Sequence, residues 1–257
     1  MVRGRSKVPV KNAEELSLMR RAGQIVAEVL YELQGQIEPG MTTRRLDEIA
    51  ETIIRDMGGV PSFKGYLGYP ATICASINEE VVHGIPSTRR LKEGDIVSVD
   101  VGAIWQGYQG DAALTVPVGE VEESLWSLLA TTQHALEAGI AAARAGVRLG
   151  AISHAIEGAA EEAGLSVIRE YGGHGIGQQM HEPPNVPNWG PPNRGVTLEA
   201  GMTFALEPML ALCGAETKVL SDHWTVVTVD SCPSAHFEHT IAITKDGAEI
   251  LTRRQER

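Results

Sequence analysis

Cysteine is scarce in this sequence, and the few cysteines present follow no recognisable spacing. Cys74, Cys213 and Cys232 make an odd number, and no CxxC pair occurs among them. Secreted domains that depend on disulfides usually carry an even, closely spaced set. The pattern therefore argues against a disulfide framework and favours a reducing compartment.

Basic residues and long apolar stretches are also lacking. Lys and Arg total 22 against 33 for Asp and Glu, which gives a formal net charge of −11. Because phosphate binding needs a basic face, nucleic acid is not expected as a principal ligand. No apolar stretch reaches membrane-spanning length, and the first eleven residues are not followed by the apolar segment of a signal peptide. We expect a cytoplasmic monomer without membrane contact.

The basic residues that are present gather at the N-terminus. Residues 1–11 are expected to form a solvated arm, with a transient contact to the ribosome as the alternative. Residues 12–257 are expected to form a single domain, whose length allows one large core or two fused halves. The basic residues of the arm are Arg3, Arg5, Lys7 and Lys11.

Helical periodicity predicts four helices. The first covers residues 13–33, with Asn12 as N-cap and Glu15 in the position of a capping box. A second amphipathic helix covers residues 43–57 and ends at a glycine pair. The pattern returns over two later segments, which are residues 122–143 and 152–163.

One predicted β-hairpin contains two acidic residues among apolar ones. Residues 96–101 alternate as in a strand, residues 112–116 form the antiparallel partner, and a Gln-Gly pair supplies the turn. This pairing places Asp100 and Asp111 opposite or diagonal to each other, with Cβ atoms about 4.5–8 Å apart. Because unpaired carboxylates in an apolar setting repel each other and resist ionisation, a cation between them is the simplest interpretation.

The second part of the chain repeats this order of helix, helix and acidic hairpin. Residues 92–100 align with residues 199–207, which places Asp100 over Glu207. Residues 111–116 correspond to residues 238–243 across a longer loop. The sequence therefore predicts an α+β fold with two pseudo-twofold-related halves, each of helices packed on an antiparallel sheet. The halves cover about 12–120 and 121–251.

The acidic hairpins and one histidine form a candidate metal centre. Glycines flank His174 and let the backbone approach closely, and an imidazole among carboxylates commonly anchors a transition metal. Five mostly anionic groups exceed the needs of one open catalytic ion but suit two divalent ions about 3.5–4 Å apart. The candidate ligands are Asp100, Asp111, His174, Glu207 and Glu238.

Five motifs in this order resemble those of the type I methionine aminopeptidases, metallopeptidases of the pita-bread fold, in their short bacterial form. The motifs are SINEEVVHGIP, SVDVGAIWQGYQGDAA, GGHGIGQQMHEPP, FALEPM and HFEHTIAIT. The resemblance implies that Asp111 and Glu238 bridge two ions. Asp100 would bind one of these ions, and His174 with Glu207 the other. Mixed carboxylate and imidazole ligands accept Co, Mn, Fe or Zn, so the metal stays open.

The same resemblance implies the substrate-contacting residues. Considered by itself, His83 is more typical of a structural histidine. The resemblance instead makes His83 and His181 the two active-site histidines that bind no metal. Sulfur and aromatic side chains suit a methionine thioether, and the implied pocket residues are Tyr66, Tyr69, Cys74, Met180 and Trp224. Many relatives differ at four positions, with His, Cys, Thr and Thr where this chain has Leu67, Val82, Gly102 and Ala205.

The implied function is removal of the initiator methionine from nascent polypeptides whose second residue is small. Glu207 would take a proton from the attacking water, while His83 and His181 stabilise the reacting amide. A proline-specific relative, of the aminopeptidase P or prolidase type, is one alternative, but the additional N-terminal domain usual there does not fit before Asn12. A non-catalytic binding protein of the same fold is another, and it would lack some of the five candidate ligands.

Overall fold

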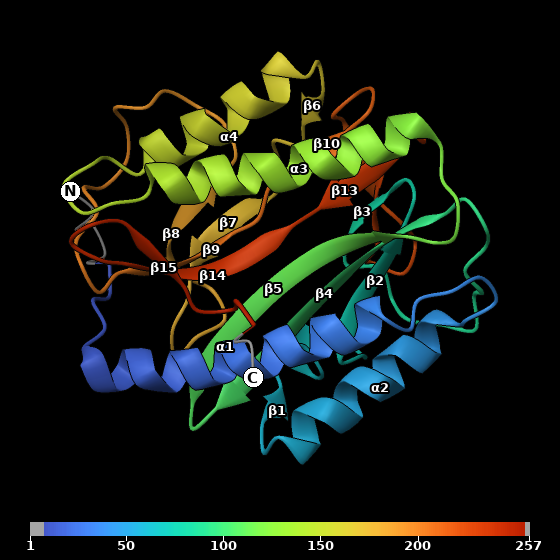
Figure 1. Cartoon of the computed structure of the whole chain (residues 1–257), viewed down its shortest axis with the longest axis horizontal. Coiled ribbons are helices and arrows are strands. Elements are labelled where there is room, and N and C mark those ends of the chain that lie inside the picture. The colour runs from blue at the N-terminus through green and yellow to red at the C-terminus, as the bar shows by residue number, and fades with distance from the viewer. Residues whose placement is uncertain (1–7, 255–257) are drawn as a thin grey trace.

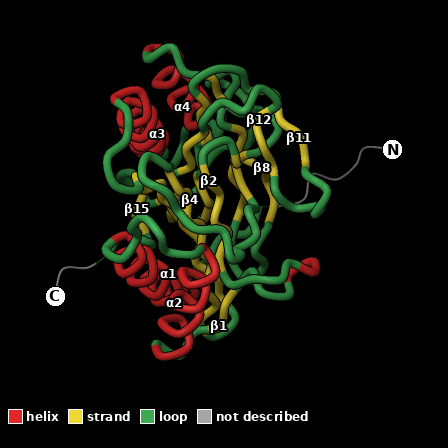
Figure 2. The backbone as a smooth tube through the Cα atoms, turned by 90° about the vertical axis from the view of Figure 1, so that its right-hand side faces the viewer, coloured by secondary structure: helices red, strands yellow, loops and turns green. Residues whose placement is uncertain are grey.

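Four helices cover one face of a large antiparallel sheet in residues 8–254, the part of the chain that the structure describes (Figure 1). In this computed structural model, a side view shows the helices together on one side of the strands (Figure 2). The α+β class predicted from the sequence is confirmed. The helices are α1 (Ala13–Gln34), α2 (Thr43–Asp56), α3 (Glu123–Ala142) and α4 (Gly150–Glu162).

Local signals begin the helices near the positions that the sequence predicts. At the start of α1, the Asn12 side chain accepts hydrogen bonds from the N–H groups of Glu14 and Glu15. The Glu15 carboxylate in turn accepts one from the Asn12 N–H, 2.8 Å away. This capping box satisfies backbone donors that the first helical turn leaves unpaired. Thr42 caps α2 through the N–H of Arg45.

The large sheet has nine strands in residues 8–254, and its pairings are antiparallel. Its order is β1-β4-β5-β14-β9-β7-β8, with β2 also paired to β4 and β15 to β14. The strands are β1 (Val60–Pro61), β2 (Ile73–Ile77), β4 (Ile96–Trp105), β5 (Tyr108–Pro117), β7 (Gly172–Gly175), β8 (Glu182–Pro187), β9 (Thr203–Leu206), β14 (Glu238–Ile243) and β15 (Ala248–Ile250).

Two smaller sheets have the strand orders β13-β10-β6 and β11-β12-β3. Four of these strands lie in the connection between β9 and β14, where the sequence predicts a longer loop. β11 and β12 stand on the side of the large sheet away from the helices (Figure 2). The strands are β3 (Glu80–Val82), β6 (Ser166–Val167), β10 (Met209–Ala211), β11 (Thr217–Val219), β12 (Val226–Thr228) and β13 (Ser234–His236), and a 3₁₀ turn, η1, covers Tyr66–Gly68.

The central strands have the order that two related halves require. Exchanging the halves would replace β4 by β9 and β5 by β14, and the order β4-β5-β14-β9 is unchanged by this exchange. One apolar core lies between the first helix pair and β4 and β5, and a second lies between α3, α4 and the strands of the other half. The division at residues 12–120 and 121–251 stays a prediction.

The acidic hairpin forms as predicted. Gln106 and Gly107 form its two-residue turn with φ of +48° and +85°, a conformation that glycine adopts without strain. Asp100 pairs with Ala113 and Gly102 pairs with Asp111, so the two carboxylates are diagonal neighbours. Because side chains alternate along a strand, the valines of β4 enter the helix-covered core while Asp100 points to the opposite face.

The structure corrects two expectations. Cys213 and Cys232 are joined by a disulfide, because the antiparallel pairing of β10 with β13 brings the positions just beyond these strands together, 5.9 Å apart at Cα. Lys11 belongs to no solvated arm: it is buried and paired with Glu182. Arg3, Arg5 and Lys7 lie outside the described residues.

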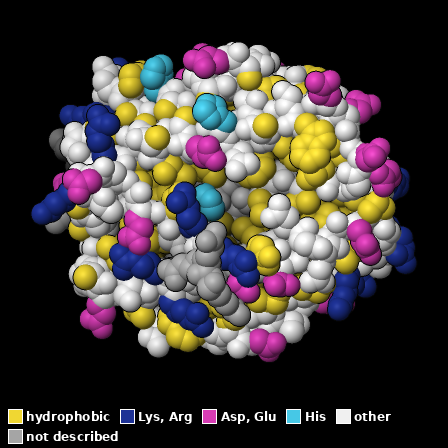
Figure 3. Space-filling view, viewed as in Figure 1, with side chains coloured by type: hydrophobic (Ala, Val, Ile, Leu, Met, Phe, Trp, Pro, Cys, Tyr) yellow, Lys and Arg dark blue, Asp and Glu magenta, His cyan; other side chains and the backbone are white. Residues whose placement is uncertain are grey.

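Charged groups are spread over the helix-bearing face. Lys and Arg side chains stand among Asp and Glu side chains there (Figure 3). Within residues 8–254, no helix has both the length and the apolarity needed to cross a bilayer.

The packing of α1 on the sheet predicts the effect of one substitution. A Cβ on Gly23 would overlap the carbonyl of Leu251, and a Cβ on Gly110 would lie 2.7 Å from the Gly23 N–H nitrogen. We expect Gly23→Ala to lower the free energy of unfolding in urea by about 1–3 kcal/mol, the usual cost of overpacking.

Gly158→Ala in α4 is the matched control. No atom lies within 4 Å of its added Cβ, so the better helix former should raise stability by up to about 1 kcal/mol. Equal unfolding midpoints for wild type and Gly23→Ala would contradict the proposed closeness of α1 and the sheet.

Candidate metal centre

Five neighbouring strands each bring one of the predicted ligands to the face of the sheet away from the helices. In the order β4-β5-β14-β9-β7, these residues are Asp100, Asp111, Glu238, Glu207 and His174. Glu207 directly follows β9, and the other four lie within their strands. The register of the strands thus brings together five side chains that are far apart in the sequence.

Three of these side chains are close enough to share one ion. One atom each of Asp111, His174 and Glu238 lie within 4.8 Å of one another. Glu207 stands beside them, with Oε1 3.5 Å from His174 Nε2. His174 Nδ1 lies 2.9 Å from the Gly175 carbonyl and donates to it, which leaves Nε2 as a lone pair facing the carboxylates. Two acceptors this close need a proton or a metal cation between them.

Burial makes the cluster unfavourable in the absence of a cation. Loss of water, with nearby carboxylates in addition, raises the pKa of Glu207 to about 8 and the pKa values of Asp111 and Glu238 well above their usual range. Burial raises the pKa of Asp100 to about 7 and lowers the pKa of His174 to about 4. Among the described residues, Oδ1 of Asp100, Oδ1 of Asp111 and Oε1 of Glu238 find no hydrogen-bond partner. A divalent cation would satisfy these oxygens.

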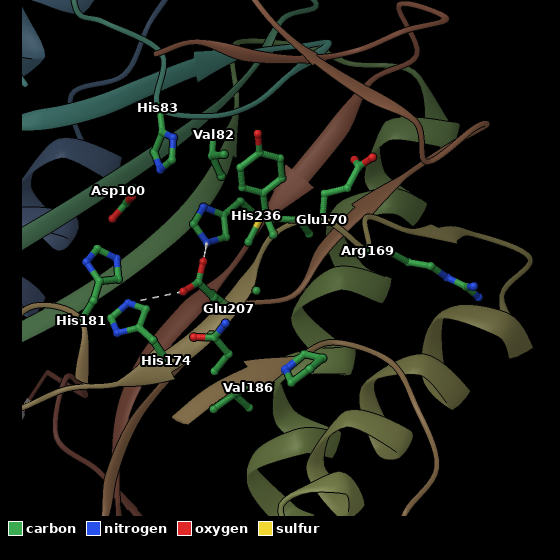
Figure 4. A pocket seen from close by; sticks show the side chains of 16 residues that line it. Val82, His83, Asp100, Arg169, Glu170, His174, His181, Val186, Glu207 and His236 are labelled. Atoms are coloured by element: carbon green, nitrogen blue, oxygen red, sulfur yellow. Dashed lines mark ion pairs between the residues drawn. The ribbon is translucent and has the colours of Figure 1, made fainter. Parts of the chain in front are cut away.

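His236 is a site residue that sequence reasoning missed. Its Nε2 lies 3.8 Å from Glu238 Oε2 and 4.0 Å from Glu207 Oε2, and only 2% of the residue is exposed. Figure 4 shows Glu207 between His174 and His236. The signal was its place two residues before Glu238, which puts both on the same face of an extended segment.

A cavity of about 180 Å³ lies on one side of this cluster. Tyr69 packs edge-on against Trp224, with ring centroids 5.0 Å apart, and its hydroxyl donates to the carbonyls of Ile73 and Gly84. Cys74 and Met180 are buried in the same wall. All five predicted pocket residues line the cavity together with Phe63 and Leu67. Gly102 lies against two of these side chains: a Cβ there would be 2.8 Å from Phe63 Cε1 and 2.9 Å from Met180 Cε.

The two predicted active-site histidines stand at the junction of this cavity with a second one. The ring of His181 lies 4.3 Å from that of His174, and its Nδ1 is 2.9 Å from the Tyr66 hydroxyl. His83 faces the edge of Trp224 at 6.3 Å. Burial lowers the pKa of both histidines, that of His83 to about 4. Both are therefore neutral at pH 7.

The second cavity, of about 270 Å³, shares Glu207 and both histidines with the first and extends from Glu207 towards Arg169 and Glu170 (Figure 4). Val82, Met209, His236 and Tyr171 also line it. Arg169 and Glu170 stand at the outer end in Figure 4. The candidate metal centre thus lies between a smaller, more apolar cavity and a larger, more polar cleft.

The raised carboxyl pKa values predict how stability depends on pH. In metal-free protein, folded Asp100 and Glu207 keep protons that the unfolded chain releases near pH 4, so stability falls as the pH rises through about 7 and 8. The buried histidines, whose pKa values are lowered in the folded state, make stability rise with pH, but only below about pH 6.5. Between pH 7 and 8.5, urea unfolding should show a loss of at least about 1 kcal/mol.

Added Mn²⁺ should remove this loss, because a bound cation favours the ionised carboxylates. Glu207→Gln should reduce it in the metal-free protein. A metal-free wild type whose stability rises from pH 7 to 8.5 would contradict the electrostatic account.

Comparison with known proteins gives this geometry a context. The sequence matches metallopeptidase family M24 over residues 17–245. Methionine aminopeptidase 1 of Bacillus subtilis is 52% identical over 95% of this chain and 98% of its own length. Methionine aminopeptidase 1 of Mycobacterium tuberculosis is 50% identical over 98% of this chain and 97% of its own.

Solved structures agree with the sequence relatives. The methionine aminopeptidase of Thermotoga maritima superposes with a TM-score of 0.95 at 46% identity, covering 96% of this chain and 100% of that one. The prolidase of Pyrococcus furiosus reaches 0.79 at 22% identity, covering 96% and 66%, and shares the fold. The predicted pita-bread fold is confirmed. Sequence, fold and the buried carboxylate and imidazole donors agree, and the chain belongs to metallopeptidase family M24.

Proposed function

We propose that this protein is a metal-dependent aminopeptidase that removes the initiator methionine from nascent polypeptides when the second residue is small. The observation that carries the proposal is the cavity lined by Cys74, Met180 and aromatic rings beside the carboxylate cluster. A methionine side chain in this cavity would bring its peptide bond to the carboxylates. Relatives that are half identical over nearly the whole chain are methionine aminopeptidases, which supports the same activity.

The proposed centre holds two divalent ions. The unpartnered oxygens of Asp100, Asp111 and Glu238 support this, since each needs a positive partner. Asp100, Asp111, His174, Glu207 and Glu238 would hold the ions. The bound ions would supply a water whose pKa is lowered towards about 7. Co, Mn, Fe and Zn all suit this ligand set.

The protein's own groups would perform the proton transfers. Glu207 lies between the cluster and His236, and we assign it the role of taking the proton of the attacking water and passing it to the leaving amine. Because Tyr66 can donate its hydroxyl proton to Nδ1 of His181, Nε2 of this histidine keeps a proton to donate. His181 and His83 would stabilise the oxyanion and the scissile amide.

The residue after methionine would lie in the cleft beyond the cluster. Val82, Met209 and His236 line this cleft and are themselves buried, so packing fixes their positions. Alanine, glycine or serine would fit there, whereas a long side chain would collide with buried groups that cannot move without cost.

The two alternatives are less well supported. Prolidases of this fold are 22–23% identical in sequence and larger, so they share only the architecture. A non-catalytic binding protein would not need all five candidate ligands, and all five meet in one site. We further propose that the protein acts in the cytoplasm as a monomer. A ribosome contact through Arg3, Arg5 and Lys7 stays a prediction.

The first test measures specificity. Purified protein loaded with Co²⁺ or Mn²⁺ should release methionine from Met-Ala-Ser, and chelation should abolish this activity. For Met-Lys-Ser, kcat/KM should be lower by a factor of roughly 10² or more, because its second side chain does not fit the cleft. Mass spectrometry of both reactions gives the comparison.

Leu-Ala-Ser serves as the control for the methionine cavity and should be a poor substrate. Equal kcat/KM for Met-Lys-Ser and Met-Ala-Ser would refute the claim about the second residue. Full activity in verified metal-free protein would refute the metal-dependent mechanism.

A second test separates a ligand from a proton donor. His174→Ala should lower both metal content and activity, because it removes a nitrogen donor from the centre. His181→Ala should keep its metal and lose roughly 10²–10³ in kcat, the usual cost of one oxyanion donor. Metal titration and steady-state kinetics distinguish the two.

A thermal melt of each variant controls for simple destabilisation. If His181→Ala loses metal as His174→Ala does, or if it retains the wild-type kcat, the assigned roles are wrong.

A further inference from the structure

The segment between β7 and β8, residues 176–181, carries Met180 and His181, and we name it the histidine loop. Its first half is held by backbone hydrogen bonds: the Ile176 N–H donates to Thr203, and the Gln109 N–H of β5 donates to the Gly177 carbonyl, 2.8 Å away. Its second half, which bears the two side chains of the site, has fewer backbone contacts with the sheet.

A buried ion pair lies against this second half. Lys11 Nζ is 2.6 Å from Glu182 Oε2, and the two side chains are only 6% and 10% exposed. The other oxygen of Glu182 accepts a hydrogen bond from the Gln179 N–H, 3.3 Å away. One carboxylate therefore connects Lys11 to the backbone of the histidine loop.

The pair also fills the space beside the loop. A Cβ on Gly177 would lie 2.5 Å from Glu182 Oε1 and 2.5 Å from Lys11 Cε. The loop backbone thus lies directly on the ion pair, with no side chain between them.

Lys11 is itself held in place at both ends. Its N–H donates to the Gly201 carbonyl at 2.7 Å, and the next residue, Asn12, is the N-cap of α1. Burying two charges is costly, and an apolar pair of similar size often stabilises a fold just as much as a buried ion pair does. The gain from this ion pair is therefore the fixed position that it gives the histidine loop.

We propose that Lys11 and Glu182 are positioning residues that hold the histidine loop so that Met180 closes the methionine cavity and His181 stands beside His174. The inference rests on the proposed function, since it assigns the pair a part in that reaction. The hydrogen bond between Tyr66 and His181 orients the imidazole only while the backbone beneath it is fixed. Misplacing a reacting group by about 1 Å costs up to roughly 10²-fold in rate.

The test uses Lys11→Met and Glu182→Gln in the full-length protein. Glu182→Gln keeps an oxygen for the Gln179 N–H but removes the charge. Both variants should lower kcat for Met-Ala-Ser roughly tenfold or more, and hydrogen exchange of residues 176–181, followed by mass spectrometry, should become faster. Arg20→Met is the matched control, because it breaks an exposed ion pair of the neighbouring helix α1, to Glu249 at 2.6 Å, without touching the loop.

A double variant distinguishes positioning from general destabilisation. In a His181→Ala background, Lys11→Met should lower kcat by less than twofold, because the reacting group that it positions is gone and a misplaced Met180 raises KM instead. A merely structural role predicts the full loss of kcat again. Unchanged exchange and kcat in both single variants would overturn the proposal. A wild type that cleaves no Met-Ala-Ser would count against the proposed function, while the exchange measurement still tests the positioning. If Lys11→Met does not fold, Glu182→Gln provides the same two measurements.

Discussion

The repulsion among four buried carboxylates is the constraint on which this structure depends. Asp100, Asp111, Glu207 and Glu238 would separate or keep protons at neutral pH unless a cation held them, and burial has already raised their pKa values. Their convergence is imposed by the sheet, whose two apolar cores are packed by helices on the other face. The apolar packing therefore stabilises an arrangement that is electrostatically unfavourable without metal.

Features encoded by neighbouring residues could be predicted from the sequence. The capping box of α1, the turn at Gln106-Gly107 and the alternation in β4 each depend on residues a few positions apart, and each forms as expected. The meeting of the carboxylates followed from the repeated acidic hairpin. The role of His83 did not follow from its own surroundings in the sequence and rested on family resemblance alone.

The contacts that the sequence did not predict join distant segments. Lys11 and Glu182 are separated by 171 positions, and nothing near either residue indicates the other. The disulfide of Cys213 with Cys232 follows from the pairing of β10 with β13, which no local pattern announced. In HFEH, His236 and Glu238 face the same site, but an imidazole two residues from a ligand has no local signal that separates it from a structural histidine.

The position of β14 in the middle of the large sheet bears on biosynthesis. This strand supplies Glu238 and separates β5 from β9, yet it is made after both of them. Until it emerges, the two halves of the sheet have no common partner strand and the carboxylates cannot meet. Long-range pairings of this kind form late and slowly. An enzyme that trims other polypeptides during translation thus stays inactive until its own β14 has left the ribosome, however early its other strands have folded.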